Sequence, residues 1–168
     1  MLLMCFWLVN FISAEIVPCT KLEAFFPPKD SCVKRITDLL DAATKTIYVQ
    51  CYSFTSKPIA EALLRAKNRG VKVVIIADES QKTAASSVVQ DLAEAGIDVV
   101  FDDKPAIAHC KIMIIDAKTV LTGSYNWTAA AEEKNAENLI IFENQENVAA
   151  LFFTNWQRRF AVSSPYLR

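Results

Sequence analysis

The 168-residue chain holds a single histidine, His109, and a lysine stands two positions after it. Imidazole titrates near neutral pH and can act there as a nucleophile, a base or an acid. The residues HCKIMIID predict a strand over 109–116, so His109 and Lys111 point to one face and Cys110 to the other. A buried lysine without a partner is costly, and an anion between the two side chains would remove that cost. The pair therefore indicates an anion site, with a purely structural histidine as the alternative.

A second polar group follows in the sequence GSYN. Gly123, Ser124 and Asn126 stand between a predicted strand and a predicted helix. A hydroxyl, an amide and backbone N–H groups at a helix start can cradle a phosphate, although a turn with a helix cap would use the same residues. Asp116 is an odd number of residues from the histidine, so it points to the opposite face of the predicted strand. It lies at the end of that strand, where we expect it to order the turn or a neighbouring segment.

The elements that must position these residues alternate between strands and helices. Asp30 or Ser31 can cap a first helix, whose apolar positions keep helical spacing as far as Ala43. Further helices are predicted over 57–70, 87–96, 126–134 and 145–160, and strands over 46–54, 71–78, 97–101, 109–116, 119–124 and 137–142. This order predicts an α/β fold, a single-domain α-β-α sandwich around one mixed sheet.

Composition and charge set the broad class. With 52% hydrophobic and 22% charged residues, the chain fits one globular domain with a proper core. The formal net charge of −1 gives no overall basic field of the kind that nucleic-acid binders carry. A polyanion would have to be held by a local patch or by the reaction site itself.

The N-terminus indicates export. Residues 1–14 are uncharged, and this apolar run is shorter than the roughly 20 residues that span a bilayer. The run suits a signal peptide cleaved after Ala14, although no basic residue precedes it, and an uncleaved membrane anchor is the alternative. We expect a periplasmic or secreted protein with an irregular, proline-containing leader over 15–30 and a domain over 31–162.

Four cysteines remain beyond the predicted signal: Cys19, Cys32, Cys51 and Cys110. Cys19 and Cys32 flank a proline-containing loop and could form a disulfide in an oxidising compartment, and free buried thiols are the alternative. No Cys-x-x-Cys pair is present, and with one histidine a zinc site is not expected.

The complete spacing, H-x-K-x4-D-x6-G-S-x-N, resembles the HKD motif of the phospholipase D superfamily. CYSFTSKPIAEALLRAKNRGVKVVIIAD and KNAENLIIF are similar to segments of small bacterial members, so the resemblance covers about residues 31–160 and is strongest to one-motif secreted endonucleases. LTGSYNWT also resembles mitochondrial phospholipase D-like proteins. Two departures are Cys110, where the endonucleases often have Asp, and a loop over 79–87 without the expected glycines.

The resemblance implies hydrolysis of a phosphodiester through a phosphohistidine, without metal or cofactor. The implied catalytic residues are His109, Lys111, Asp116 and Glu137, with Lys111, Gly123, Ser124 and Asn126 binding the phosphate. Glu137 is expected to accept a hydrogen bond from the imidazole. The chemistry uses two histidines, and one chain supplies one, so we expect a homodimer with a composite site.

Two substrates fit this chemistry. The first is nucleic acid, DNA and also RNA, cleaved by a nonspecific endonuclease. A basic patch could come from Arg65, Lys67, Arg69 and Lys72, with a solvated helix end as the alternative. Tyr125 and Trp127 could stack on bases, with core packing as the alternative. The second is a phospholipid, phosphatidylcholine or cardiolipin, with the N-terminus as membrane anchor. An inactive binding module is disfavoured because the motif is intact.

Overall fold

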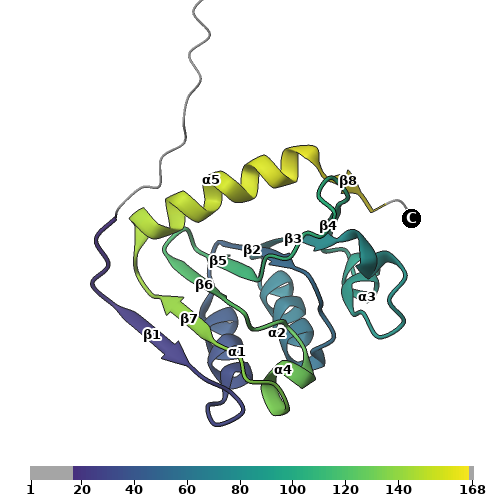
Figure 1. Cartoon of the computed structure of the whole chain (residues 1–168). Coiled ribbons are helices and arrows are strands. Elements are labelled where there is room, and N and C mark those ends of the chain that lie inside the picture. Colours follow the sequence, from purple (N-terminus) through teal and green to yellow (C-terminus); the bar gives the residue numbers. More distant parts are fainter. Residues whose placement is uncertain (1–16, 167–168) are drawn as a thin grey trace, which may run out of the picture.

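Eight strands form one mixed sheet, and helices pack on both of its faces (Figure 1). The computed structural model describes residues 17–166, so the predicted signal over 1–14 lies outside the described residues. In chain order the strands are β1 Leu22–Phe25, β2 Thr46–Cys51, β3 Lys72–Asp78, β4 Asp98–Asp102, β5 Ile112–Ile115, β6 Thr119–Gly123, β7 Leu139–Phe142 and β8 Ser164–Pro165. Across the sheet their order is β1-β7-β6-β5-β2-β3-β4-β8. The helices are α1 Cys32–Ala42, α2 Lys57–Asn68, α3 Val89–Glu94, α4 Ala129–Glu133 and α5 Glu146–Val162, with a 3-10 helix over Glu79–Lys82.

The predicted α-β-α sandwich is confirmed by the two cores on either side of the sheet. Along β3, Val73 and Ile75 join the core shared with α1 to α4, whereas Val74 and Ile76 join the core beneath α5. Because both faces are covered, the strand reads as a continuous apolar run. β2, β3 and β4 are parallel, and the remaining pairs of neighbouring strands are antiparallel.

The ends of the domain differ from the prediction. The leader over 15–30 was expected to be irregular, but β1 lies within it and pairs with β7, with Leu22 opposite Phe142. At the other end, β8 pairs with β4 beyond residue 162. Both are short edge strands beside prolines, where the side-chain pattern is weak and backbone pairing with a distant strand determines the structure. The sheet therefore extends beyond the expected 31–162 at both ends.

Of the two possibilities left open for Cys19 and Cys32, the structure has free thiols, as it does for all four cysteines in residues 17–166. Cys32 is fully buried at the start of α1, and burial raises the pKa of its thiol to about 12. Cys19 lies on the surface, so the two sulfurs occupy different environments. Within the same residues, none of the helices has the length and apolar character needed to cross a membrane.

Candidate active site

The predicted site residues of three segments meet at one end of the sheet. β5 begins at Ile112, three residues later than expected, so His109 and Lys111 lie in the chain that leads into it. Ile112 is paired with Thr122 of β6 and with Gln50 of β2, and Gly123 is paired with Leu139 of β7. This register brings the residues before β5, after β6, before β7 and after β2 to a common edge.

Lys111 is a buried cation at this edge. The side chain is only 4% exposed, and its Nζ donates a hydrogen bond to the backbone oxygen of His109 at 2.6 Å. Burial lowers the pKa of the ammonium, although the carboxylates of Glu137 and Asp78 oppose this effect. Among residues 17–166, no carboxylate oxygen lies within 4.0 Å of the Lys111 nitrogen. The predicted anion-binding character of Lys111 therefore has a physical basis.

His109 is exposed and lies against an aromatic ring that the sequence analysis did not single out. The centroids of the His109 imidazole and the Tyr52 ring are 4.5 Å apart, with the rings tilted by 53°. Tyr52 follows β2 directly, and the Lys111 Nζ lies 5.0 Å from the same ring centroid. The only sequence signal for Tyr52 is its place at the carboxyl end of a buried strand.

The predicted alternation around the motif holds. Cys110 packs with Ile112 and Ile114 in the core beneath α5. Met113 and Ile115, which point to the same side as Lys111, instead belong to the opposite core together with Cys51. The residue between the histidine and the lysine thus points away from the site.

Asp78 is a second residue that the sequence analysis missed. It ends β3, is 7% exposed, and its Oδ2 accepts the backbone N–H of Ala108 at 2.7 Å. Its Oδ1 accepts the backbone N–H and the hydroxyl of Ser80. Because Ala108 immediately precedes the histidine, this carboxylate fixes the chain that carries the imidazole.

Glu137 lies in the site, but its expected hydrogen bond to the imidazole is not formed among the described residues. The Ser124 hydroxyl donates to Glu137 Oε2 at 2.5 Å, and the Asn135 amide donates to Oε1 at 3.0 Å. The Ser124 hydroxyl in turn accepts the backbone N–H of Asn138 at 3.0 Å. Both carboxylate oxygens are thus occupied within the loops that flank β6 and β7, so Glu137 orders the cradle within this chain.

Asn126 and Gly123 complete the predicted cradle in different ways. The Asn126 Oδ1 atom is buried without a hydrogen-bond partner among the described residues, so this side-chain amide is available to a ligand. At Gly123 (φ +150°), an added Cβ would lie 2.3 Å from the backbone oxygen of Asn138. The glycine is therefore required by the close approach of two strands.

Asp116 lies away from the histidine and lysine, so any part that it plays in catalysis would be indirect. It follows β5 at the end opposite to His109 and accepts hydrogen bonds from the backbone N–H groups of Thr44, Lys45 and Thr46 and from the Thr44 hydroxyl. The expectation that it orders a neighbouring segment agrees with these contacts.

Four other residues considered as ligands in the sequence also have structural contacts. Tyr125 and Trp127 are fully buried core residues. Arg65 and Arg69, from the expected basic patch, form ion pairs with Asp41. Among residues 17–166, no group of three or more His, Cys, Asp or Glu side chains is arranged to hold a metal ion.

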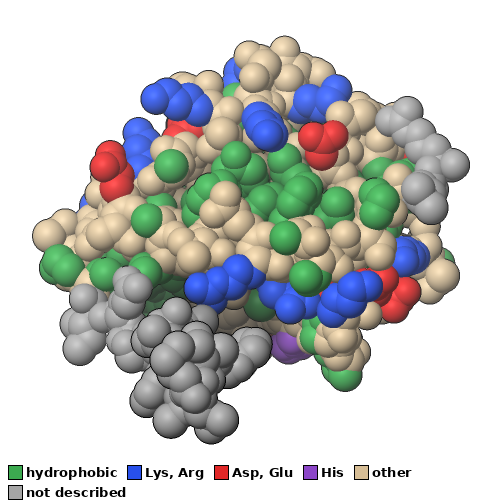
Figure 2. Space-filling view, turned by 90° about the horizontal axis from the view of Figure 1, so that it is seen from above, with side chains coloured by type: hydrophobic (Ala, Val, Ile, Leu, Met, Phe, Trp, Pro, Cys, Tyr) green, Lys and Arg blue, Asp and Glu red, His purple; other side chains and the backbone are tan. Residues whose placement is uncertain are grey.

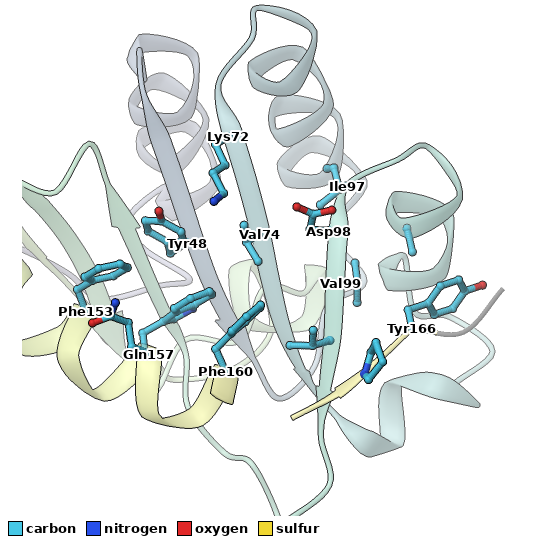
Figure 3. A pocket seen from close by; sticks show the side chains of 14 residues that line it. Tyr48, Lys72, Val74, Ile97, Asp98, Val99, Phe153, Gln157, Phe160 and Tyr166 are labelled. Carbon is cyan, nitrogen blue, oxygen red and sulfur yellow. The ribbon is translucent and has the colours of Figure 1, made fainter. Parts of the chain in front are cut away.

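A separate cavity of about 710 Å³ lies between the sheet and the second half of α5 (Figure 3). Phe153, Trp156 and Phe160 form its aromatic wall, and Lys72 and Asp98 stand at its rim. Lys72 begins β3, whereas Asp78 at the other end supports the histidine segment. Figure 2, which faces α5, shows hydrophobic side chains gathered on this face with Lys and Arg side chains around them.

Comparison with known proteins gives consistent matches. Residues 36–159 match the family model described as cardiolipin synthase, PLD-like domain. The chain is 44% identical over 142 residues to a phospholipase D of Rickettsia conorii, covering 84% of this chain and 70% of that protein. It is 32% identical over 142 residues to a mitochondrial cardiolipin hydrolase of Xenopus tropicalis, covering 84% and 68%.

Solved structures agree with these relatives. Nuc from Salmonella typhimurium, described as a phospholipase D family member, matches with a TM-score of 0.83 and 35% identity over 88% of this chain and 99% of Nuc. NucT from Helicobacter pylori matches with a TM-score of 0.79 and 25% identity, over 87% and 99%. Since the family match spans most of the domain and includes the histidine–lysine site, the chain belongs to the phospholipase D superfamily of phosphodiesterases.

Proposed function

We propose that this protein is a metal-independent endonuclease that hydrolyses the phosphodiester bonds of DNA, and also of RNA, through a phosphohistidine at His109. The observation that carries the proposal is the buried Lys111 ammonium, which has no acidic partner within 4.0 Å among residues 17–166 and lies beside an exposed imidazole. A phosphate anion would supply the missing negative charge and would bring its phosphorus atom close to the nucleophile.

The reaction proceeds in two displacements. One imidazole attacks phosphorus while a second, protonated imidazole gives its proton to the leaving oxygen, and the phosphorus–oxygen bond breaks. The second imidazole, now neutral, takes a proton from water as that water attacks phosphorus and releases His109. Lys111, together with Ser124 and Asn126, neutralises and holds the non-bridging oxygens during both steps, a task that metal ions perform in many phosphoryl-transfer enzymes.

The second imidazole comes from a second copy of the chain. His109 is the only histidine in the sequence, so one chain cannot supply both the nucleophile and the acid. The imidazole is exposed, and Ile107, two residues before it, is 55% exposed although apolar. An exposed apolar side chain beside the histidine suits a symmetric contact in which two copies form one composite site.

Nucleic acid is favoured as the substrate by the compact, one-motif architecture. The resemblance to one-motif secreted endonucleases covers about residues 31–160, and the match to Nuc extends over 99% of that chain. The uncharged segment over 1–14 supports export to the periplasm or beyond the cell, with an N-terminal anchor as the alternative.

A phospholipid substrate is the second candidate, and the names of the curated relatives favour it. The proteins that are 44% and 32% identical are a phospholipase D and a mitochondrial cardiolipin hydrolase. The exposed Ile107 would then contact lipid, while the second imidazole would still come from a second chain.

The deciding experiment incubates the full-length chain in EDTA with single-stranded DNA, double-stranded DNA, RNA and phospholipid vesicles. His109→Ala is the test variant, and Lys118→Ala, an exposed lysine in the β5–β6 turn, is the control. EDTA-resistant cleavage of nucleic acid that is lost in the histidine variant and retained in the control supports the proposal. Headgroup release from vesicles alone identifies a phospholipase, and inactivity on every substrate contradicts both candidates.

A further inference from the structure

Tyr52 touches both active groups of the candidate site. Its ring centroid lies 4.5 Å from that of the His109 imidazole and 5.0 Å from the Lys111 Nζ atom. The residue follows β2, whose Gln50 is paired with Ile112 of β5. The tyrosine is therefore held by one strand against the segment that precedes its neighbour.

The Lys111 ammonium needs stabilisation that does not come from an acid. It is 4% exposed, so it has lost nearly all of its water, and its hydrogen bond to the His109 carbonyl uses one of three N–H donors. An aromatic face attracts a cation within about 6 Å of the ring centroid, and the attraction grows when the cation is desolvated. The Tyr52 ring is placed to provide this attraction.

An aromatic ring differs from a carboxylate in one respect that matters for phosphate binding. A carboxylate would neutralise the ammonium and repel an incoming phosphate, whereas the ring carries no net charge. The same ring lies against the histidine, which becomes a cation when it is protonated during the proposed reaction. One uncharged group can therefore stabilise and orient both cations without competing with the substrate.

We propose that Tyr52 is a positioning residue that holds the Lys111 ammonium and the His109 imidazole against its ring, as an uncharged substitute for an acidic partner. The meaning of this role for catalysis rests on the proposed function, but the contact itself is a property of the chain without substrate.

Other titratable groups lie near the lysine and also affect its pKa, so a test must leave them unchanged. Cys110 adjoins it in sequence, Glu137 precedes β7, Asp78 ends β3 and Cys51 ends β2. Burial lowers the pKa of the lysine, and the carboxylates of Glu137 and Asp78 act in the opposite direction. A variant that alters only the ring leaves all four in place, so a change in the Lys111 pKa would report the ring.

The first measurement is the Lys111 pKa in the free protein, followed by NMR of isotope-labelled lysine. Tyr52→Phe should leave it unchanged because the ring remains, whereas Tyr52→Leu should lower it by about 0.5–1.5 pH units. Tyr48→Leu is the matched control, because it removes a tyrosine ring that packs on Phe153 and Trp156 under α5. An unchanged Lys111 pKa in Tyr52→Leu, or an equal fall in Tyr52→Phe, would overturn the proposal.

A second series keeps the shape of the ring, so that a failure of Tyr52→Leu to fold would not leave the proposal untested. Phenylalanine, 4-fluorophenylalanine and pentafluorophenylalanine at position 52 weaken the negative ring face in steps. The Lys111 pKa and the affinity for inorganic phosphate, measured by NMR titration, should fall together along the series, with phosphate binding about 3- to 30-fold weaker at its end. Equal pKa values and affinities in all three proteins would contradict the role of the ring.

Nuclease assays of the same variants separate this proposal from the proposed function. If Tyr52 acts as proposed, Tyr52→Leu should lose kcat as well as affinity, since both the lysine and the nucleophile lose their support. If the unmodified protein cleaves no phosphodiester, the proposed function fails, while the lysine titration still tests the contact.

Discussion

Replacing Asp116 distinguishes a residue that builds the fold from one that performs chemistry. Its carboxylate accepts four hydrogen bonds of 2.8–3.0 Å from residues 44–46, the loop that joins α1 to β2. Its own backbone has φ +51°, a conformation that Asn tolerates better than Ala. We therefore compare Asp116→Asn, which keeps one acceptor oxygen and the preferred backbone, with Asp116→Ala, which loses both.

The loss of stability expected for Asp116→Ala depends on how exposed residues 44–46 are. Thr44 and Lys45 are exposed, so their N–H groups can bond to water once the carboxylate is gone. Each of the four bonds then contributes about 0.5 kcal/mol, the low end for a hydrogen bond, and the left-handed backbone of alanine costs about 1–2 kcal/mol more. Asp116→Ala should therefore lower the free energy of unfolding by about 3–4 kcal/mol, backbone strain included, and the melting temperature by roughly 6–14 °C. Asp116→Asn should cost about half as much.

At low pH the difference in unfolding free energy between the unmodified protein and Asp116→Ala should disappear. Burial by itself raises the pKa of the Asp116 carboxyl, but the N–H groups of Thr46, Thr44 and Lys45 outweigh it and hold the pKa below its usual value. Because the folded-state pKa is depressed, the stabilisation is fully present above the unfolded pKa of about 3.9 and is lost as the pH falls through the lower, folded value. The stability gap to Asp116→Ala should therefore narrow only below about pH 4.

Urea unfolding followed by circular dichroism measures these stabilities, and activity is assayed at 20 °C, where the variants remain folded. We expect the activity of folded Asp116→Asn to stay within about threefold of the unmodified protein, since β5 separates the residue from the histidine. A variant of normal stability whose activity falls a hundredfold would refute this reasoning and would return Asp116 to the catalytic residues.

Three further predictions concern the site and its assembly. Lys111→Ala should lower kcat/KM by about 10²–10³, whereas Lys118→Ala should leave it unchanged in the same steady-state assay. Gly123→Ala should lower the free energy of unfolding, measured in urea, by about 1–3 kcal/mol more than Gly70→Ala does. The added Cβ at position 123 would collide with the backbone oxygen of Asn138, whereas a Cβ at position 70 would have open space around it. Equal amounts of unmodified protein and His109→Ala can be unfolded and refolded together, and the activity compared with that of the same total amount of unmodified protein. It should be about a quarter if two copies share one site, and about half if each chain acts alone.

Residue patterns within single elements were sufficient to predict most of the fold. The core strands and the helices follow from apolar periodicity, and the alternation of Cys110 and Lys111 was read correctly from strand parity. The edge strands β1 and β8 were missed because they have four and two residues and owe their conformation to pairing with a distant strand.

The site was predictable only as far as it is local in sequence. His109 and Lys111 are two residues apart, and their shared face follows from strand geometry. Tyr52 and Asp78 join them through the register of β2, β3 and β5, which no pattern within one segment encodes. Glu137 was assigned to the correct region, but its hydrogen bonds within the chain come from the Ser124 hydroxyl and the Asn135 amide, which lie outside the histidine–lysine motif.

The partners of two carboxylates explain why the lysine remains a free cation. Asp78 and Glu137 both act electrostatically on Lys111, yet neither lies within ion-pair distance of it. Asp78 is occupied by Ser80 and the backbone of Ala108, and Glu137 by the neutral donors already described. Because these donors hold both acids in place, their charges favour the protonated lysine from a distance without closing the space beside it. The distant acids, together with the proposed role of the aromatic neighbour, would keep a buried ammonium charged and open to an anion, which is the property that the proposed metal-independent hydrolysis requires.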